Sequence, residues 1–261
     1  LASSDEAKPS QPVFEHAGEP SKTSASRPSS SMRLGLSIPL LNEADLVTEV
    51  VASIHASLTE ANIDHTLALV NNGSTDRTAE IIDSLKVPDQ VEVVQLQHNL
   101  GYGGGILAGI AHLEQRGLPD IIGWCWGDGQ VTAAVLPHLY EAINAGADIA
   151  KVHRRERQDG LRRQVMTAAY AATMRAFGIA DRDVNGCPKL MTRAAFEAIQ
   201  PRSTDWFIDA ETIIKAEALA LQVHQHDAVM RPRPAGTSKV TLRTLGEFAW
   251  NIARWQLGSS T

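Results

Sequence analysis

Asp128 is the residue of this sequence best placed to do chemistry. It follows an apolar run, Ile121–Trp126, of the type that forms a buried strand, and a glycine stands on each side of it. In an open parallel sheet, ligands bind just beyond the carboxyl ends of the strands, so a carboxylate there predicts contact with a ligand or a metal. Because Asp-Gly is also a common turn dipeptide, a simple turn or a helix cap is the competing interpretation.

Polar side chains and glycines follow two other predicted strands. Asn72, Ser74 and Asp76 supply amide, hydroxyl and carboxylate groups that could read a nucleobase edge and ribose hydroxyls, with a turn capped by Ser74 or Thr75 as the alternative. After the next strand, glycines at a helix N-terminus would let the backbone approach a phosphate closely, with tight packing as the alternative; they include Gly101, Gly103 and Gly104.

The glycine-rich segment also predicts a second function class. Residues 103–108 match the dinucleotide pattern G-x-G-x-x-A, and Asp128 lies about twenty residues further on, as in NAD-dependent dehydrogenases. That pattern normally follows the first strand of its βαβ unit, whereas here it follows the third predicted strand. We therefore keep the dehydrogenase as an alternative.

Two further groups could handle charge. Asp128 and Gln130 together could hold Mg²⁺ or Mn²⁺ bridged to a diphosphate, because Mg²⁺ usually keeps few protein ligands and several waters. A basic loop after the predicted strand 148–152 includes Arg154 and Arg163, and a guanidinium grips phosphate with a planar fork. A solvated basic surface is the alternative for this loop.

Alternating strands and helices must position these groups. The expected strands are residues 34–41, 65–71, 91–96 and 121–126, and the helices between and after them start near Asn42, Thr75, Ile106 and Ala133. Such alternation predicts an α/β fold with a mostly parallel sheet and helices on both faces. The turns after the strands would then gather along one edge, where the candidate residues meet.

The second half of the chain has a less regular pattern. We expect the strand 148–152, a helix through Met174, a loop and strand over 181–191, a helix starting near Trp206, and a last amphipathic helix that carries Trp250 and Trp255. That last helix could rest on a membrane surface or pack on the domain.

Composition sets the outer limits. The chain has 261 residues, of which 43% are hydrophobic and 21% charged, and a net charge of -6 argues against a general nucleic-acid binder. Nine serines and four prolines in residues 1–31 predict a disordered tail before one domain at 32–261. Two cysteines without metal-ligand spacing fit a reducing compartment, and no apolar run of membrane-spanning length or signal peptide is seen, so a cytoplasmic location is expected.

The ordered motifs resemble the family 2 glycosyltransferases of GT-A fold, and most of all the group of dolichol-phosphate mannose synthase and other polyprenyl-phosphate glycosyltransferases. Residues 38–43 resemble the family's opening nucleotide-binding signature, which places Pro39, Asn42 and Glu43 on the donor. Three further motifs, at residues 70–78, 99–104 and 128–130, resemble the family's second signature, its third signature and the end of its Asp-x-Asp-x-Gln metal motif. Two later segments, 183–189 and Arg231 with 236–239, resemble motifs of the polyprenyl-phosphate group.

The chain departs from the family pattern at two places. Trp126 stands where the family has the first Asp of its metal motif, so metal binding would depend on Asp128, Gln130 and the diphosphate. Asn71 and Asn72 stand where the second signature often has two aspartates. Because Asn can donate as well as accept a hydrogen bond, the resemblance leaves the base of the nucleotide open.

The resemblance also implies an acceptor side. Arg154, Arg163 and Thr167 correspond to positions that hold the acceptor phosphate, Asp209 and Glu211 lie near the acceptor, and the later motifs add Arg231, Ser238 and Lys239. Thr167 could instead bond only its own helix backbone, and Asp209 could be a helix cap.

The implied activity is inverting transfer of a sugar from a nucleoside diphosphate sugar by direct displacement. Asp128 would neutralise the leaving diphosphate, and the acceptor would be a polyprenyl phosphate, with the C-terminal helix placed to contact the membrane surface. If the acceptor were instead a hydroxyl, a general base would be needed and Asp209 is the candidate. A small soluble acceptor is the first alternative to the polyprenyl phosphate. A protein that binds sugar nucleotide without catalysis is the second.

Overall fold

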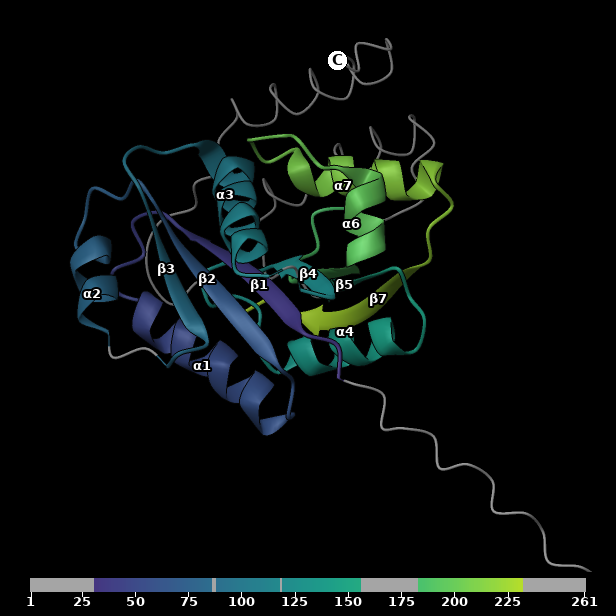
Figure 1. Cartoon of the computed structure of the whole chain (residues 1–261), viewed down its shortest axis with the longest axis horizontal. Coiled ribbons are helices and arrows are strands. Elements are labelled where there is room, and N and C mark those ends of the chain that lie inside the picture. Colours follow the sequence, from purple (N-terminus) through teal and green to yellow (C-terminus); the bar gives the residue numbers. More distant parts are fainter. Residues whose placement is uncertain (1–30, 86–87, 118, 156–182, 232–261) are drawn as a thin grey trace, which may run out of the picture. The chain divides into compact units, whose positions relative to one another are not determined.

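The computed structural model describes residues 31–85, 88–117, 119–155 and 183–231. Within them, one sheet has the strand order β3-β2-β1-β4-β6-β5-β7 (Figure 1). Its strands are β1 (Leu34–Leu40), β2 (His65–Asn72), β3 (Val91–Leu96), β4 (Ile121–Trp124), β5 (Ile149–Arg155), β6 (Lys189–Thr192) and β7 (Val223–Val229). The helices are α1 (Val47–Glu60), α2 (Thr78–Ser84), α3 (Gly101–Gln115), α4 (Val135–Asn144), α6 (Arg193–Ile199) and α7 (Ile208–Ala218).

The centre of the sheet is buried on both faces. In β1, the side chains of Leu34, Leu36, Ile38 and Leu40 are all 0% exposed, and Ser37 on the opposite face is also 0% exposed. β1 pairs in parallel with β2 and with β4, and β2 pairs in parallel with β3. A near-continuous apolar run is what a parallel strand covered on both faces requires, so the predicted α/β arrangement of these four strands is confirmed.

Helices cover both faces of the sheet. α1, α2 and α4 pack together on one face, while α3, α6 and α7 lie on the other (Figure 1). α1 directs Val47, Val50, Val51, Ile54 and Leu58 inward, at the three- and four-residue spacing of a helix with one apolar face. This arrangement leaves the loops after β1, β2 and β4 together at the carboxyl edge.

The sheet is mixed in its second half. β6 runs antiparallel to both β4 and β5, and β5 pairs in parallel with β7. The sequence pattern missed β7 and α6. β7 has only one buried residue, Ala228, and its run of His and Gln lacks the apolar alternation that marks a strand.

Several predicted boundaries were wrong. α2 starts at Thr78 rather than Thr75, and α3 starts at Gly101 rather than near Ile106, because the glycines themselves are helical. β5 extends to Arg155, so Arg154 belongs to a strand and not to a loop. The predicted tail, the helix through Met174 and the last amphipathic helix lie outside the described residues.

His65 should make stability depend on pH. It is 4% exposed, its Nδ1 lies 2.8 Å from the carbonyl oxygen of Ile63, and its Nε2 lies 3.0 Å from Nδ1 of His55. Burial lowers the pKa of His65 below its ordinary value of 6.5. The unfolded chain therefore binds a proton more readily than the folded one, and this contribution to stability is lost as pH falls through about 6.5.

We predict that His65→Asn, which keeps a donor for the Ile63 carbonyl, reduces the fall in melting temperature between pH 7.5 and pH 5. The measurement is a thermal melt in matched buffers. His98→Asn, at an exposed loop residue, is the control and should keep the wild-type slope. An unchanged slope for His65→Asn would assign the pH dependence to other groups.

Candidate active site

Asn42 joins the loop after β1 to the loop after β2. Its Oδ1 accepts hydrogen bonds from the backbone N–H groups of Thr75 (2.8 Å) and Asp76 (3.3 Å), and its own N–H donates to Ser74 Oγ (3.0 Å). Pro39 lies three residues earlier, at the end of β1. The structure thus brings these predicted donor-binding residues together at the carboxyl edge, with their polar groups bonded to one another.

Asp76 serves the start of α2. Its Oδ1 accepts from the backbone N–H of Thr78 (2.9 Å) and from Thr78 Oγ1 (2.5 Å). Partial burial opposes ionisation, but these hydrogen bonds hold the pKa of Asp76 below its ordinary value. The alternative that Ser74 or Thr75 caps this helix was therefore wrong. The buried residue Glu43 is fixed alongside, because its backbone N–H donates to Thr78 Oγ1 (2.9 Å).

Asn72 holds the start of α3. Its Nδ2 donates to the carbonyl oxygen of Gly101 (2.8 Å), and its Oδ1 accepts from the N–H of Leu100 (2.9 Å). Both ends of the amide group are therefore engaged within the protein. The structure gives Asn72 the role of positioning the third loop, whereas the sequence predicted that it would contact the donor.

The glycines of α3 make room for protein backbone. A Cβ on Gly101 would clash with the carbonyl oxygen of Thr204, and a Cβ on Gly103 would clash with that of Ser203. The N–H of Gly104 donates to the Thr204 carbonyl (2.9 Å). The packing alternative thus accounts for these glycines, since the first turn of α3 faces residues 203–204.

Asp128 lies in the loop after β4 and is 7% exposed. Its Oδ1 accepts from the backbone N–H of Gln130 (3.1 Å). Burial, and to a smaller extent the charge of Asp128, raises the pKa of the Cys125 thiol to about 12. Gln130 in turn contacts the segment after β7: its Nε2 donates to the carbonyl of Arg231 (3.2 Å), and its carbonyl accepts from the Arg231 N–H (2.8 Å). Three predicted site residues therefore lie side by side.

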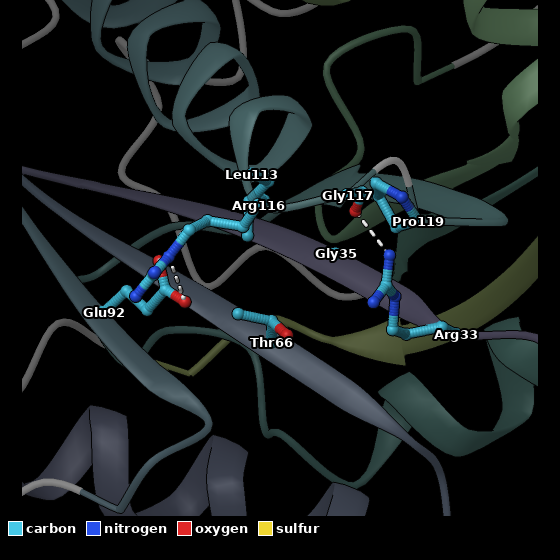
Figure 2. Close-up of a pocket in the computed structure, with 8 residues that line it drawn as sticks. All are labelled: Arg33, Gly35, Thr66, Glu92, Leu113, Arg116, Gly117 and Pro119. Atoms are coloured by element: carbon cyan, nitrogen blue, oxygen red, sulfur yellow. Dashed lines mark hydrogen bonds and ion pairs between the residues drawn. The ribbon is translucent and has the colours of Figure 1, made fainter.

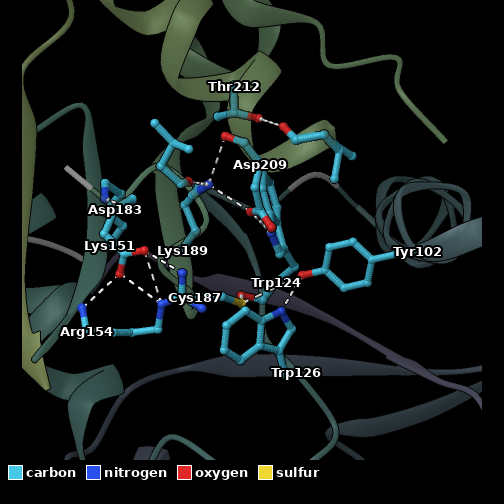
Figure 3. A network of polar contacts seen from close by, with 12 residues as sticks. Tyr102, Trp124, Trp126, Lys151, Arg154, Asp183, Cys187, Lys189, Asp209 and Thr212 are labelled. Atoms are coloured by element: carbon cyan, nitrogen blue, oxygen red, sulfur yellow. Dashed lines mark hydrogen bonds and ion pairs between the residues drawn. The ribbon is translucent and has the colours of Figure 1, made fainter. Parts of the chain in front are cut away.

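Trp126, at the position of the missing metal ligand, is fixed by its neighbours. Its indole Nε1 donates to the hydroxyl of Tyr102 (2.8 Å), and the guanidinium carbon of Arg154 lies 5.2 Å from the centre of its ring system (Figure 3). Tyr102 also stacks on Trp206, with ring centroids 4.3 Å apart. The contacts connect the β4 loop to α3, to β5 and to the segment before α7.

Arg154 is paired inside the protein. Its side chain donates to both carboxylate oxygens of Asp183, and its backbone N–H donates to Oδ2 (2.8 Å). Burial alone would raise the pKa of Asp183, but Arg154 holds it well below its usual range. Lys151, which is 0% exposed, donates to the backbone carbonyl of Asp183 (2.7 Å). The guanidinium predicted to hold an acceptor phosphate is therefore already matched by a carboxylate.

Asp209 forms a buried ion pair. Its Oδ1 accepts from Lys189 Nζ (2.8 Å) and from the indole Nε1 of Trp124 (3.0 Å), and the two charged side chains are 2% and 0% exposed (Figure 3). Asp209 lies in the first turn of α7, whose N-cap is Phe207, so the helix-cap alternative was wrong. A carboxylate held in this way is suited to positioning β6 against α7, and the predicted general base has no support from its contacts.

Glu211 also has internal partners. It accepts from the backbone N–H groups of Arg202 (3.0 Å) and Ser203 (2.8 Å) and from Lys215 Nζ (2.6 Å). Burial opposes ionisation, but these donors hold the pKa of Glu211 below its ordinary value. Glu211 thus fixes the segment that covers the start of α3. Arg163, Thr167, Ser238 and Lys239 lie outside the described residues.

A pocket of 230 Å³ opens at the other end of the sheet. Arg33, Gly35, Thr66 and Glu92 line it at the amino ends of β1, β2 and β3, and Arg116 comes from the end of α3 (Figure 2). Arg116 is paired with Glu92 at 3.1 Å. The pocket is thus separate from the carboxyl edge that carries Asp128.

Sequence reasoning missed several residues of this region. Tyr102, Lys151, Lys189 and the carboxylate of Asp183 were not singled out, although they form the polar contacts around Trp126 and Asp209. A signal was present for the two lysines, because each lies within an apolar strand pattern, where a charge needs a partner. Nothing in the sequence names that partner.

Comparison with known proteins identifies the family. Residues 36–203 match the model of the family described as glycosyl transferase family 2. The chain belongs to this family. The predicted family is thereby confirmed, and the dehydrogenase alternative was wrong.

Relatives and solved structures agree with this assignment. An undecaprenyl-phosphate 4-deoxy-4-formamido-L-arabinose transferase of Edwardsiella ictaluri is 32% identical over 47% of this chain and 37% of its own length. The protein of the same name from Erwinia tasmaniensis is 28% identical over 84% of this chain and 66% of its own length. The predicted resemblance to polyprenyl-phosphate glycosyltransferases is confirmed by these names. The chain spans between about a third and two thirds of these relatives' length.

The fold also matches a solved structure. Glucosyl-3-phosphoglycerate synthase of Mycobacterium tuberculosis, in complex with Mn²⁺, uridine diphosphate and glucosyl-3-phosphoglycerate, superposes with a TM-score of 0.65. It is 19% identical, and the match covers 89% of this chain and 85% of that one. The GT-A fold predicted from the sequence is confirmed.

We predict that Lys189→Met destabilises the protein by about 3–5 kcal/mol, because it leaves the Asp209 carboxylate buried without its cation. Urea unfolding at pH 7 measures the loss. Arg77→Met is the control, since Arg77 and Glu80 form an exposed pair with side chains 79% and 73% exposed; there we expect a change below about 1 kcal/mol.

The double variant Lys189→Met/Asp209→Leu should be more stable than Lys189→Met alone, because it removes both charges together. Equal stability of the single variant and wild type would show that the ion pair contributes nothing to the joint between β6 and α7.

Proposed function

We propose that this chain is an inverting glycosyltransferase that moves a sugar from a nucleoside diphosphate sugar to a phosphate-bearing acceptor, most simply a polyprenyl phosphate. The observation that carries the proposal is the placement of Asp128 in a family 2 fold. The carboxylate lies at the carboxyl end of β4, and β4 pairs with β1, whose following loop carries Asn42 and is joined to Ser74 and Asp76. Ligands of open α/β sheets bind along this edge.

The proposed chemistry is direct displacement at the anomeric carbon. An oxygen of the acceptor phosphate attacks the carbon, the bond from that carbon to the diphosphate oxygen breaks, and the diphosphate leaves with the electron pair. A phosphate nucleophile is already anionic and needs no strong general base. This agrees with the buried ion pair that engages Asp209.

The loops of the carboxyl edge would hold the donor. Asn42, Ser74 and Asp76 form one bonded unit next to Glu43, and that rigidity would pre-organise the nucleoside site at little entropic cost. The dolichol-phosphate mannose synthase-like arrangement of motifs supports this placement.

The oxygen donors near Asp128 suit a divalent metal only if the ion is also bound by the donor diphosphate. Asp128 and Gln130 offer a carboxylate and an amide oxygen, which suits Mg²⁺ or Mn²⁺ held mainly by the donor diphosphate and water. When bound, such an ion would neutralise charge on the leaving diphosphate. Support comes from the Mn²⁺ complex of the structural neighbour.

The acceptor proposal rests on the names of the relatives, which carry undecaprenyl phosphate. A small soluble phosphate acceptor is the second candidate, since the structural neighbour was solved with glucosyl-3-phosphoglycerate. No helix within the described residues is long and apolar enough to cross a membrane. Contact with the membrane surface and a cytoplasmic location are parts of the proposal, and the free cysteines Cys125 and Cys187 agree with a reducing compartment.

We predict that one class of nucleoside diphosphate sugar raises the melting temperature in a concentration-dependent way, because a ligand that binds only the folded state stabilises it. A thermal-shift panel of GDP-, UDP-, ADP-, CDP- and dTDP-sugars plus NAD, with EDTA, Mg²⁺ or Mn²⁺, measures this. Asp128→Asn should weaken donor binding about tenfold or more, whereas Asp89→Asn, in an exposed turn, is the control. Stabilisation by NAD alone would refute the proposal.

The acceptor is tested by product analysis with the donor that the panel selects. We expect labelled sugar to enter the lipid-extractable fraction when undecaprenyl phosphate in detergent is supplied, with inverted anomeric configuration by NMR. Transfer to 3-phosphoglycerate alone would select the soluble acceptor, and donor binding without transfer to either would select the non-catalytic alternative.

A further inference from the structure

Trp126 is held in a fixed position at the carboxyl edge of the sheet. Its indole N–H is committed to the Tyr102 hydroxyl, and its ring lies against the Arg154 guanidinium (Figure 3). Both neighbours are themselves fixed, Tyr102 by stacking on Trp206 and Arg154 by the carboxylate of Asp183. The indole therefore occupies its position through contacts with two separate elements of the fold, α3 and β5.

The same contacts limit how the protein could hold a cation near Asp128. Among the described residues, no group of three or more His, Cys, Asp or Glu side chains is arranged to hold a metal ion. Asp128 brings one carboxylate, and its Oδ1 already accepts from the Gln130 N–H. Two residues earlier, Trp126 offers no oxygen and directs its N–H to Tyr102.

We propose that Trp126 makes divalent-cation binding conditional on the nucleotide: the protein alone has no useful affinity for Mn²⁺ or Mg²⁺, and the cation enters only together with a nucleoside diphosphate. This inference rests on the proposed function. The inference gives Trp126 a definite role. Trp126 determines whether the protein binds the cation alone or only in its complex with a nucleoside diphosphate.

The physical reason is the number of anionic oxygens. Mg²⁺ and Mn²⁺ in proteins are held by carboxylates together with substrate phosphates and water, and affinity rises with the number of charged ligands. One carboxylate, partly satisfied by a backbone N–H, is too few without the diphosphate. The Arg154 guanidinium against Trp126 is positively charged, and it does not attract a cation. Its charge is balanced by the carboxylate of Asp183.

A carboxylate at position 126 should allow the protein to bind the cation without nucleotide. In Trp126→Asp, two carboxylates stand two residues apart in the β4 loop and could share one ion. Trp126→Phe is the matched control, because it removes the hydrogen bond to Tyr102 and keeps an aromatic ring without adding charge. Comparing the two variants separates the effect of the new carboxylate from that of the lost packing.

The experiment measures water proton relaxation in Mn²⁺ titrations of the full chain. Relaxation is enhanced when Mn²⁺ attaches to a slowly tumbling protein and much less when it binds free nucleotide. Without nucleotide, we expect no saturable enhancement for wild type or Trp126→Phe up to about 1 mM Mn²⁺, and binding about tenfold tighter or more for Trp126→Asp. With UDP or GDP, whichever stabilises the protein, wild type should show enhancement.

Several results would overturn the inference. Saturable binding of Mn²⁺ by wild type alone would do so, as would a folded Trp126→Asp variant that binds no better than Trp126→Phe. Nucleotide binding to wild type that brings no Mn²⁺ with it would also overturn it. Failure of every nucleotide to bind would instead refute the proposed function, while the titrations without nucleotide would still decide the role of Trp126.

Discussion

The buried ion pair between Lys189 and Asp209 is the contact on which the second half of this molecule depends. Lys189 lies on β6, the strand that runs antiparallel between β4 and β5, and Asp209 lies in the first turn of α7. Removing two charges from water is costly, so the pair persists only because its remaining polar groups are matched, by the Trp124 indole and by the backbone carbonyl of Val184. Because Lys189 and Asp209 must stay paired, their contact fixes α7 against the sheet.

A chain of contacts connects this ion pair to the carboxyl edge of the sheet. α7 carries Glu211, which fixes the backbone at Arg202 and Ser203, and this segment lies against the glycines that begin α3. The start of α3 is held from the other side by Asn72. These contacts connect the loops after β2 and β3 to the segment before α7. We therefore expect a change in any one of them to shift the residues on the donor side of the proposed site.

Charge in this region is balanced almost entirely within the protein. Asp183 is matched by Arg154, Asp209 by Lys189, and Glu211 by Lys215. Arg154, Asp209 and Glu211, which the family resemblance placed near an acceptor, thus serve first to hold the fold. A phosphate-bearing substrate would have to compete for these partners or use residues outside the described part of the chain. Asp128 lies in the loop after β4, at the edge of the sheet where the proposed chemistry would take place.

The sequence by itself determined the four parallel strands, the helices between them, the family, and the gathering of Asn42, Ser74, Asp76 and Asp128 at one edge. Each follows from local patterns, which periodicity and short motifs report. Only the tertiary structure decided that Asp209 is an ion-pair partner, that Arg154 is bound to Asp183, and that Trp126 is fixed by Tyr102. These pairs join residues 20, 29 and 24 positions apart, respectively. Nothing local chooses among possible partners at such separations, because the choice depends on which side chains the folded sheet brings within hydrogen-bond distance.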